Sequence, residues 1–291
     1  MKVHLDCIPC FLRQALEAAR LATDDRKVQE EVMRTILAEL AEFPLNKSSP
    51  PEIGWRAHSL VKEVTGNKDP YAPLKHSFNQ QALAVYPKLE ELIEFSDVPF
   101  ETAVRLALAG NMIDFGAQVI KDINLEEEIE VAIKAYLDRG AVLKLKTATE
   151  QAKKILFLGD NAGEIVFDKP LIKQIGPEKI TYAVKRKPII NDATLEDAQA
   201  VTLTDLVNVI DNGSEVPGTI LSLCSQEFLR HYNNTDLIVA KGQGHYETLS
   251  DEKRPIAFLF KVKCSVIAKD IKHDLGGLVV HLQNVYNTYK S

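Results

Sequence analysis

The chain has 291 residues, of which 45% are hydrophobic and 26% are charged, and its formal net charge is −6. It is long enough to bury a full hydrophobic core, and its acidic balance without a concentrated run of Lys and Arg argues against a nucleic-acid partner. Because the N-terminus lacks a signal-peptide pattern and no run of about 18 apolar residues follows, we expect a cytoplasmic protein with no membrane partner.

The first 150 residues have the periodicity of amphipathic helices. Apolar side chains recur at three- and four-residue spacing in three segments, 11–21, 28–40 and 83–95. Prolines and glycines interrupt the pattern at 43–51 and 66–73. We therefore expect a helical N-terminal domain over residues 1–150.

The pattern changes near residue 153 to short apolar runs separated by polar loops. The candidate strands are 155–158, 180–184, 206–210, 237–240 and 266–268, with a further run at 277–282. Helix-like segments such as 165–175 and 219–232 lie between them. This alternation predicts a Rossmann-like, mostly parallel α/β domain over residues 151–291.

The first loop of interest follows the run 155–158. Gly159 permits a tight turn, and Asp160, Asn161 and Glu164 come directly after it. Ligands bind at the carboxyl ends of the strands in such sheets, and these hard oxygen ligands suit Mg²⁺ or Mn²⁺. The alternative is that Asp160 or Asn161 only caps the next helix.

Two more loops carry polar groups at predicted strand ends. Asp192 follows an apolar pair and offers a second metal carboxylate, although it could also cap a helix. Lys241 is followed by Gly242, so an ammonium group and a glycine amide could hold a phosphate; a solvated lysine beside a turn is the alternative. Because all three loops supply groups of the kind that a metal-phosphate site needs, we favour such a site.

This chemistry fits a phosphomonoester hydrolase. A divalent cation and a positive side chain neutralise the anionic phosphate during attack. In haloacid dehalogenase-like enzymes, the nucleophilic aspartate is followed two positions later by a second aspartate that serves as general acid, but here that position is Ala162. We therefore favour attack by a metal-activated water molecule, with Asp160, Asn161 and Asp192 as the metal ligands. Asp160 and Asp192 are then the catalytic carboxylates, and Glu164 is a substrate contact or base.

Three motifs together resemble the metal-dependent damage-control phosphatases, which are also described as acidic-residue-methyltransferase-like proteins and were long catalogued as a domain of unknown function. They are GDNAGE at 159–164, PIINDAT at 188–194 and AKGQGHYETL at 240–249. Supporting matches are DCIPC at 6–10, AGNMIDFG at 109–116 and KCSVIA at 263–268. The motifs span nearly the whole chain, and the N-terminal CxxC resembles the stand-alone microbial branch of the family.

The resemblance implies a helical region packed on a Rossmann-like domain and a divalent metal (Mn²⁺, Ni²⁺, Co²⁺ or Mg²⁺). It also implies phosphate binding by Lys241 and places Asn111 and Asp114 at the substrate site. The implied substrates are small phosphorylated metabolites, such as sugar phosphates or damaged cofactor precursors. His245 stands where the family usually has Asn, so it would change the substrate pocket, and Ser265 stands where Pro is usual.

The sequence is compatible with other functions and with more than one role for the cysteines. An acidic residue after a strand could hold the ribose of S-adenosylmethionine in a carboxyl methyltransferase, and a non-catalytic phosphometabolite-binding module is a further alternative. Cys7 and Cys10 have either a structural role or a metal or redox role that could include Cys264. The sequence leaves the substrate, the native metal and the oligomeric state undetermined.

Overall fold

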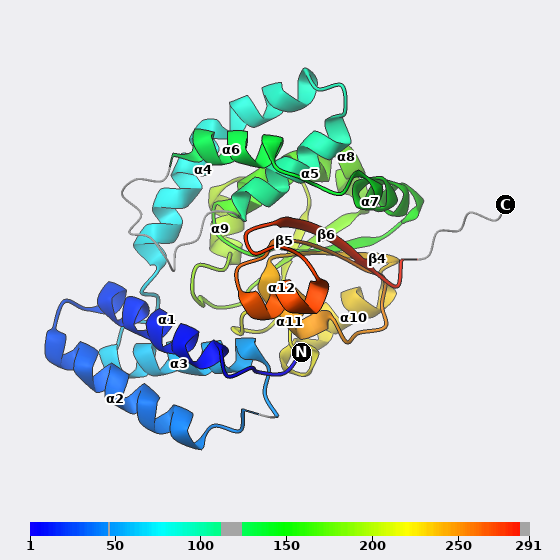
Figure 1. Cartoon of the computed structure of the whole chain (residues 1–291). Helices are drawn as coiled ribbons and strands as arrows, with labels where there is room; N and C mark the ends of the chain where they lie inside the picture. Colours follow the sequence, from blue (N-terminus) through cyan, green and yellow to red (C-terminus); the bar gives the residue numbers. More distant parts are fainter. Residues whose placement is uncertain (46, 112–123, 286–291) are drawn as a thin grey trace.

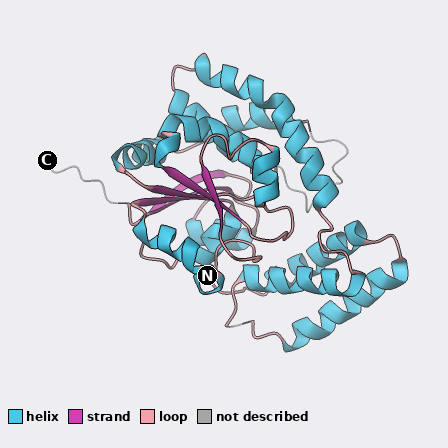
Figure 2. Cartoon of the chain, turned by 180° about the vertical axis from the view of Figure 1, so that it is seen from behind, coloured by secondary structure: helices cyan, strands magenta, loops and turns pink. Residues whose placement is uncertain are grey.

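Six strands form one sheet with helices on both faces (Figures 1 and 2). The computed structural model describes residues 1–45, 47–111 and 124–285. The sheet has the order β3-β2-β1-β4-β5-β6, and only β6 pairs antiparallel. The strands are β1 (Ile155–Leu158), β2 (Ile180–Val184), β3 (Asn208–Asp211), β4 (Leu237–Lys241), β5 (Ile256–Lys261) and β6 (Leu278–Gln283). The Rossmann-like fold predicted from the sequence is confirmed.

Helices precede the sheet and then alternate with its strands. The N-terminal helices are α1 (Cys7–Ala22), α2 (Arg26–Glu42), α3 (Pro50–Thr65), α4 (Ala72–Glu94), α5 (Pro99–Gly110), α6 (Leu125–Lys134) and α7 (Arg139–Gln151). The later ones are α8 (Glu164–Ile175), α9 (Leu195–Ala200), α10 (Gln226–Asn234), α11 (Gln243–Leu249) and α12 (Ser265–Ile271). Within the described ranges, none of these helices has the length and apolar character that crossing a bilayer requires.

Alternating side chains of the buried strands divide the core into two layers. Ile155 and Phe157 of β1 point into a cluster shared with α4 to α9, whereas Leu156 and Leu158 point into a cluster shared with α10, α11 and α12. Helices α1, α2 and α3 have their own apolar cluster and form a group beside the sheet in Figure 1. The helices α4 to α7 thus share a core with the sheet, and the division at residue 150 stays a prediction.

Several predicted element boundaries were wrong. The run 266–268 lies in α12, and the edge of the parallel part of the sheet is instead β5, whose sequence IAFLFK has no polar interruption. Strand β3 begins two residues later than predicted, and the segment 219–232 is α-helical only from Gln226 onward. Pro50 and Pro51 begin α3 rather than break a helix, because the first helical turn needs no backbone N–H donor.

Candidate functional site

The loops after β1 and β2 meet at the carboxyl edge of the sheet. Leu158 pairs with both Ala183 and Ala240, so the chain segments that follow β1, β2 and β4 lie side by side. The backbones of Asn161 and Asp192 form an isolated antiparallel bridge. These pairings bring the predicted residues of the first two loops together, as the strand-end rule requires.

Two asparagines bridge two carboxylates at the centre of the site. The Nδ2 atom of Asn111 donates to Asp160 Oδ2 at 2.9 Å and to Glu164 Oε2 at 3.0 Å. Asn161 Nδ2 makes the same two contacts at 3.0 and 2.9 Å. Asn111 therefore reaches the site from the end of α5, and its role as a substrate contact stays a prediction, whereas Asp114 lies outside the described residues.

Lys241 is enclosed by carboxylates on the inner side of this cluster. Its Nζ donates to Glu164 Oε1 and Asp168 Oδ1, both at 2.6 Å, and to the Ala107 carbonyl at 2.8 Å. Although burial alone would lower it, the Asp168 and Glu164 carboxylates hold the pKa of Lys241 above its usual value. All three ammonium protons thus have acceptors within the protein, and phosphate binding by Lys241 stays a prediction.

Asp168 and Lys185 belong to the site but were missed by the sequence analysis. Asp168 follows Glu164 by one turn of α8, and burial raises its pKa to about 6 against the effect of Lys241. Lys185 directly follows β2, and its Nζ lies 3.6 Å from Asp192 Oδ2. Two sequence signals could have identified these residues. Asp168 has helical spacing from Glu164, and Lys185 stands directly after a predicted strand.

The charges of this mostly buried cluster do not balance. The carboxylates of Asp160, Glu164, Asp168 and Asp192 face the ammonium groups of Lys185 and Lys241, which leaves a formal excess of two negative charges. Burial, together with nearby Glu164 and Asp192, raises the pKa of Asp160 well above its usual value. Because charges of one sign are costly to bury together, this excess favours a bound cation.

The oxygen atoms of Asp160, Asn161 and Asp192 fit a hard divalent cation. Burial raises the pKa of Asp192 to about 6 despite the proximity of Lys185, and its buried Oδ2 accepts no hydrogen bond from any described residue. In the parts of the chain that the structure describes, no three His, Cys, Asp or Glu side chains cluster closely enough to hold a metal. An amide oxygen from Asn161 would therefore be needed to complete the set.

Gly242 permits the close approach of β4 to Asp160. Its φ is +82°, and an added Cβ would lie 1.9 Å from Asp160 Oδ2. We expect Gly242→Ala to destabilise the protein by about 1–3 kcal/mol and to displace the Asp160 carboxylate, with loss of metal-dependent activity. Gly66→Ala is the matched control, because Gly66 has φ +72° but nothing within 4 Å of the added Cβ. Equal effects of the two substitutions on urea unfolding and on phosphate release would contradict this role of Gly242.

His245 is buried behind the site and does not line its cavity. Its Nδ1 lies 2.5 Å from the Lys241 carbonyl oxygen, and the side chain is absent from the cavity lining described below. Burial, with Lys185 nearby, lowers the pKa of His245 to about 3. It is therefore a neutral imidazole that supports the end of β4, and its role as a substrate contact stays a prediction.

The pKa of His245 predicts a loss of stability in acid. Between about pH 6.5 and pH 3 the unfolded chain binds a proton at this residue and the folded chain does not, so stability falls as the pH falls through this window. We expect His245→Asn to remove this contribution. The free energy of unfolding of the variant, relative to that of the wild type, should then rise by about 1.4 kcal/mol for each unit that the pH falls between about pH 6 and pH 4. Urea unfolding at several pH values measures the difference, and parallel stability curves would refute the expectation.

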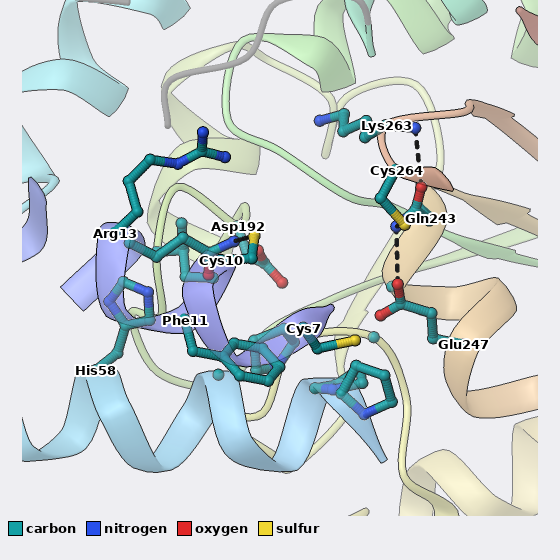
Figure 3. Close-up of a pocket in the computed structure, with 18 of the residues that line it drawn as sticks. Cys7, Cys10, Phe11, Arg13, His58, Asp192, Gln243, Glu247, Lys263 and Cys264 are labelled. Carbon is teal, nitrogen blue, oxygen red and sulfur yellow. Dashed lines mark hydrogen bonds between the residues drawn. The ribbon is translucent and has the colours of Figure 1, made fainter. Parts of the chain in front are cut away.

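A cavity of about 300 Å³ opens between the sheet edge and the α1–α3 group (Figure 3). Asp160, Asn161 and Asp192 line it, whereas Glu164 and Lys241 are fully buried beneath. Among the described residues, the cations that line it are Lys263, from the segment after β5, and Arg13, from α1. The proposed metal ligands are thus the part of the charged cluster that a small molecule can reach.

Three of the four cysteines line the same cavity. Cys7 and Cys10 come from the first turn of α1, and Cys264 caps α12. Burial raises the pKa of both Cys7 and Cys10, so their thiols are protonated at neutral pH. Cys264 and Lys263 lie at the cavity because β5 ends at Lys261. Since β5 was not predicted from the sequence, their position just after a strand was not recognised.

The sequence profile of the damage-control phosphatase ARMT1-like domain matches residues 3–279 of the chain. The chain belongs to the damage-control phosphatase ARMT1-like family. A damage-control phosphatase of Archaeoglobus fulgidus is 38% identical over 96% of this chain and 98% of its own length, and one of Pyrococcus horikoshii is 35% identical over 96% and 97%. The crystal structure of a DUF89 family protein from Pyrococcus horikoshii superposes with a TM-score of 0.86 at 34% identity, covering 98% of this chain and 99% of that one. Membership in the damage-control phosphatase family, predicted from the three motifs, is confirmed.

Proposed function

We propose that this member of the damage-control phosphatase family hydrolyses small phosphomonoesters with a divalent metal held by Asp160, Asn161 and Asp192. The observation that carries the proposal is the excess of two negative charges in a mostly buried cluster at the wall of a cavity that a small molecule can enter. The curated relatives from Archaeoglobus and Pyrococcus are named damage-control phosphatases, which supports the same reaction class.

When bound, a divalent cation would neutralise phosphate charge and acidify a water molecule, as in other metal-dependent phosphatases. The remaining work falls to the protein. Glu164 accepts hydrogen bonds from Asn161 and Lys241, so it fixes the amide of one ligand residue and the end of β4. Asn111 ties Asp160 to α5 in the same way. These contacts hold the ligands in place before substrate arrives, which reduces the reorganisation needed in the transition state.

The cation on the sheet side of the cavity, Lys263, is suited to the substrate phosphate. Lys263 lies close enough to Asp160 to act on its pKa, so its ammonium lies on the metal side of the cavity. Figure 3 shows the Lys263 side chain extending from its loop into the space opposite Arg13. A positive group at this place would attract the phosphomonoester and offset the charge that develops on its oxygens.

A metal-by-substrate screen tests the proposal. Metal-stripped protein would be supplied with Mn²⁺, Ni²⁺, Co²⁺ or Mg²⁺, and release of inorganic phosphate would be measured from p-nitrophenyl phosphate and from sugar phosphates. We expect release with at least one metal and loss of activity on adding a chelator. Binding of a sugar phosphate without phosphate release under every metal would favour the non-catalytic binding module instead.

A further inference from the structure

His58 is a buried polar side chain in the cavity whose function the metal site does not explain. It is only 3% exposed, it comes from α3, and it lines the cavity together with the proposed metal ligands. Its Nε2 is buried and has no hydrogen-bond partner among the residues that the structure describes. A buried polar atom without a partner is destabilising, so its presence in a cavity wall points to a ligand that completes it.

The imidazole of His58 is neutral. Burial, together with nearby Lys62, lowers its pKa to about 4. Its ring packs edge-on against Tyr71, with the ring centroids 5.8 Å apart. A neutral imidazole can donate or accept one hydrogen bond at Nε2, depending on its tautomer. A hydroxyl group is a suitable partner for either tautomer, since it also donates and accepts.

The position of His58 separates it from the groups that would hold the phosphate. The proposed metal ligands lie on loops of the sheet, whereas His58 comes from the α1–α3 group on the other wall of the cavity (Figure 3). Arg13 and Gln14 of α1 line the cavity on that same side. A phosphomonoester bound through its phosphate at the sheet edge would therefore direct its organic part towards α1 and α3.

We propose that His58 hydrogen-bonds through Nε2 to a hydroxyl group on the organic part of the substrate and so selects polyhydroxylated phosphomonoesters over aryl phosphates. This assignment rests on the proposed function for the position of the phosphate. It makes the α1–α3 group a specificity element, while the sheet edge supplies the reaction chemistry. The cavity of about 300 Å³ is at the small end of ligand sites, which suits a metabolite of sugar size.

The test compares binding of sugar phosphates and phenyl phosphate to the Mn²⁺-loaded protein by calorimetry. Glucose 6-phosphate and ribose 5-phosphate carry hydroxyl groups that phenyl phosphate lacks. We expect His58→Phe to reduce the ratio of their binding constants to that of phenyl phosphate by about tenfold, the effect of one lost hydrogen bond. His58→Gln, which keeps a polar group near the position of Nε2, should retain most of the preference. His76→Phe is the control, because His76 is exposed on α4.

Thermal unfolding separates ligand recognition from a structural role. Since Nε2 has no partner within the described ranges 1–45, 47–111 and 124–285, we expect His58→Phe to leave the melting temperature unchanged or to raise it. A lower melting temperature with an unchanged binding ratio, or a wild type that prefers neither sugar phosphate to phenyl phosphate, would overturn the proposal. Preferential binding that depends on His58 in a protein that releases no phosphate would support it and reject only the proposed hydrolysis.

Discussion

Asp160→Asn should abolish metal-dependent phosphate release, with a fall in rate of about 10³-fold or more. The substitution keeps the size of the side chain but removes one of the two excess negative charges that favour the cation. It also replaces a carboxylate ligand by a weaker neutral one. The variant should therefore bind Mn²⁺ more weakly in calorimetry and release less phosphate at saturating substrate. Asp192→Asn should have an effect of similar size, because Asp192 is the other carboxylate of the set.

Asp6→Asn is the matched control for this prediction. Asp6 lines the same cavity, but it is exposed and makes no side-chain capping bond to α1. We expect it to change the rate less than about twofold, since exposed charges are well screened. If Asp160→Asn and Asp6→Asn reduced activity and metal binding equally, the assignment of Asp160 as a ligand would be refuted.

Lys241→Met should destabilise the protein by about 3–5 kcal/mol and lower its melting temperature by on the order of 10 °C. The ammonium is fully buried between Glu164 and Asp168, so its removal leaves two buried carboxylates without their cation. Breaking a buried ion pair from one side is much more costly than removing the whole group of charges. Thermal and urea unfolding measure the effect directly.

Two further variants distinguish this structural role from the phosphate-binding role that the family resemblance implies for Lys241. Adding Glu164→Gln and Asp168→Asn to Lys241→Met removes all three charges and should restore part of the lost stability. Lys144→Met on the exposed surface of α7 should change neither stability nor activity. A stable Lys241→Met variant with weakened substrate binding would instead show that the ammonium serves the phosphate.

The loops that carry the proposed metal ligands could be predicted from the sequence because their information is local. In GDNAGE at 159–164 the apolar run, the glycine and the polar residues are contiguous, so the strand, the turn and the exposed strand end can be read together. Parallel strands place such ends at one edge, which brings Asp192 to Asn161 without further information. The same reasoning, applied to β5, would have found Lys263 and Cys264, but a continuous apolar run does not by itself distinguish a strand from a buried helix.

The roles of the surrounding side chains were decided only by tertiary structure. Lys241 has the same place in the sequence pattern whether it faces a phosphate or, as here, Glu164 and Asp168 on α8, because no local pattern reports which charge lies across a helix interface. His58 is an ordinary residue of an amphipathic helix until the packing of α1 on α3 encloses it. The sequence by itself therefore determined the fold class, the family and the strand-end loops, since these depend on periodicity and contiguous motifs. Tertiary packing determined the charge balance and the far wall of the cavity, because both arise from contacts between segments far apart in the chain.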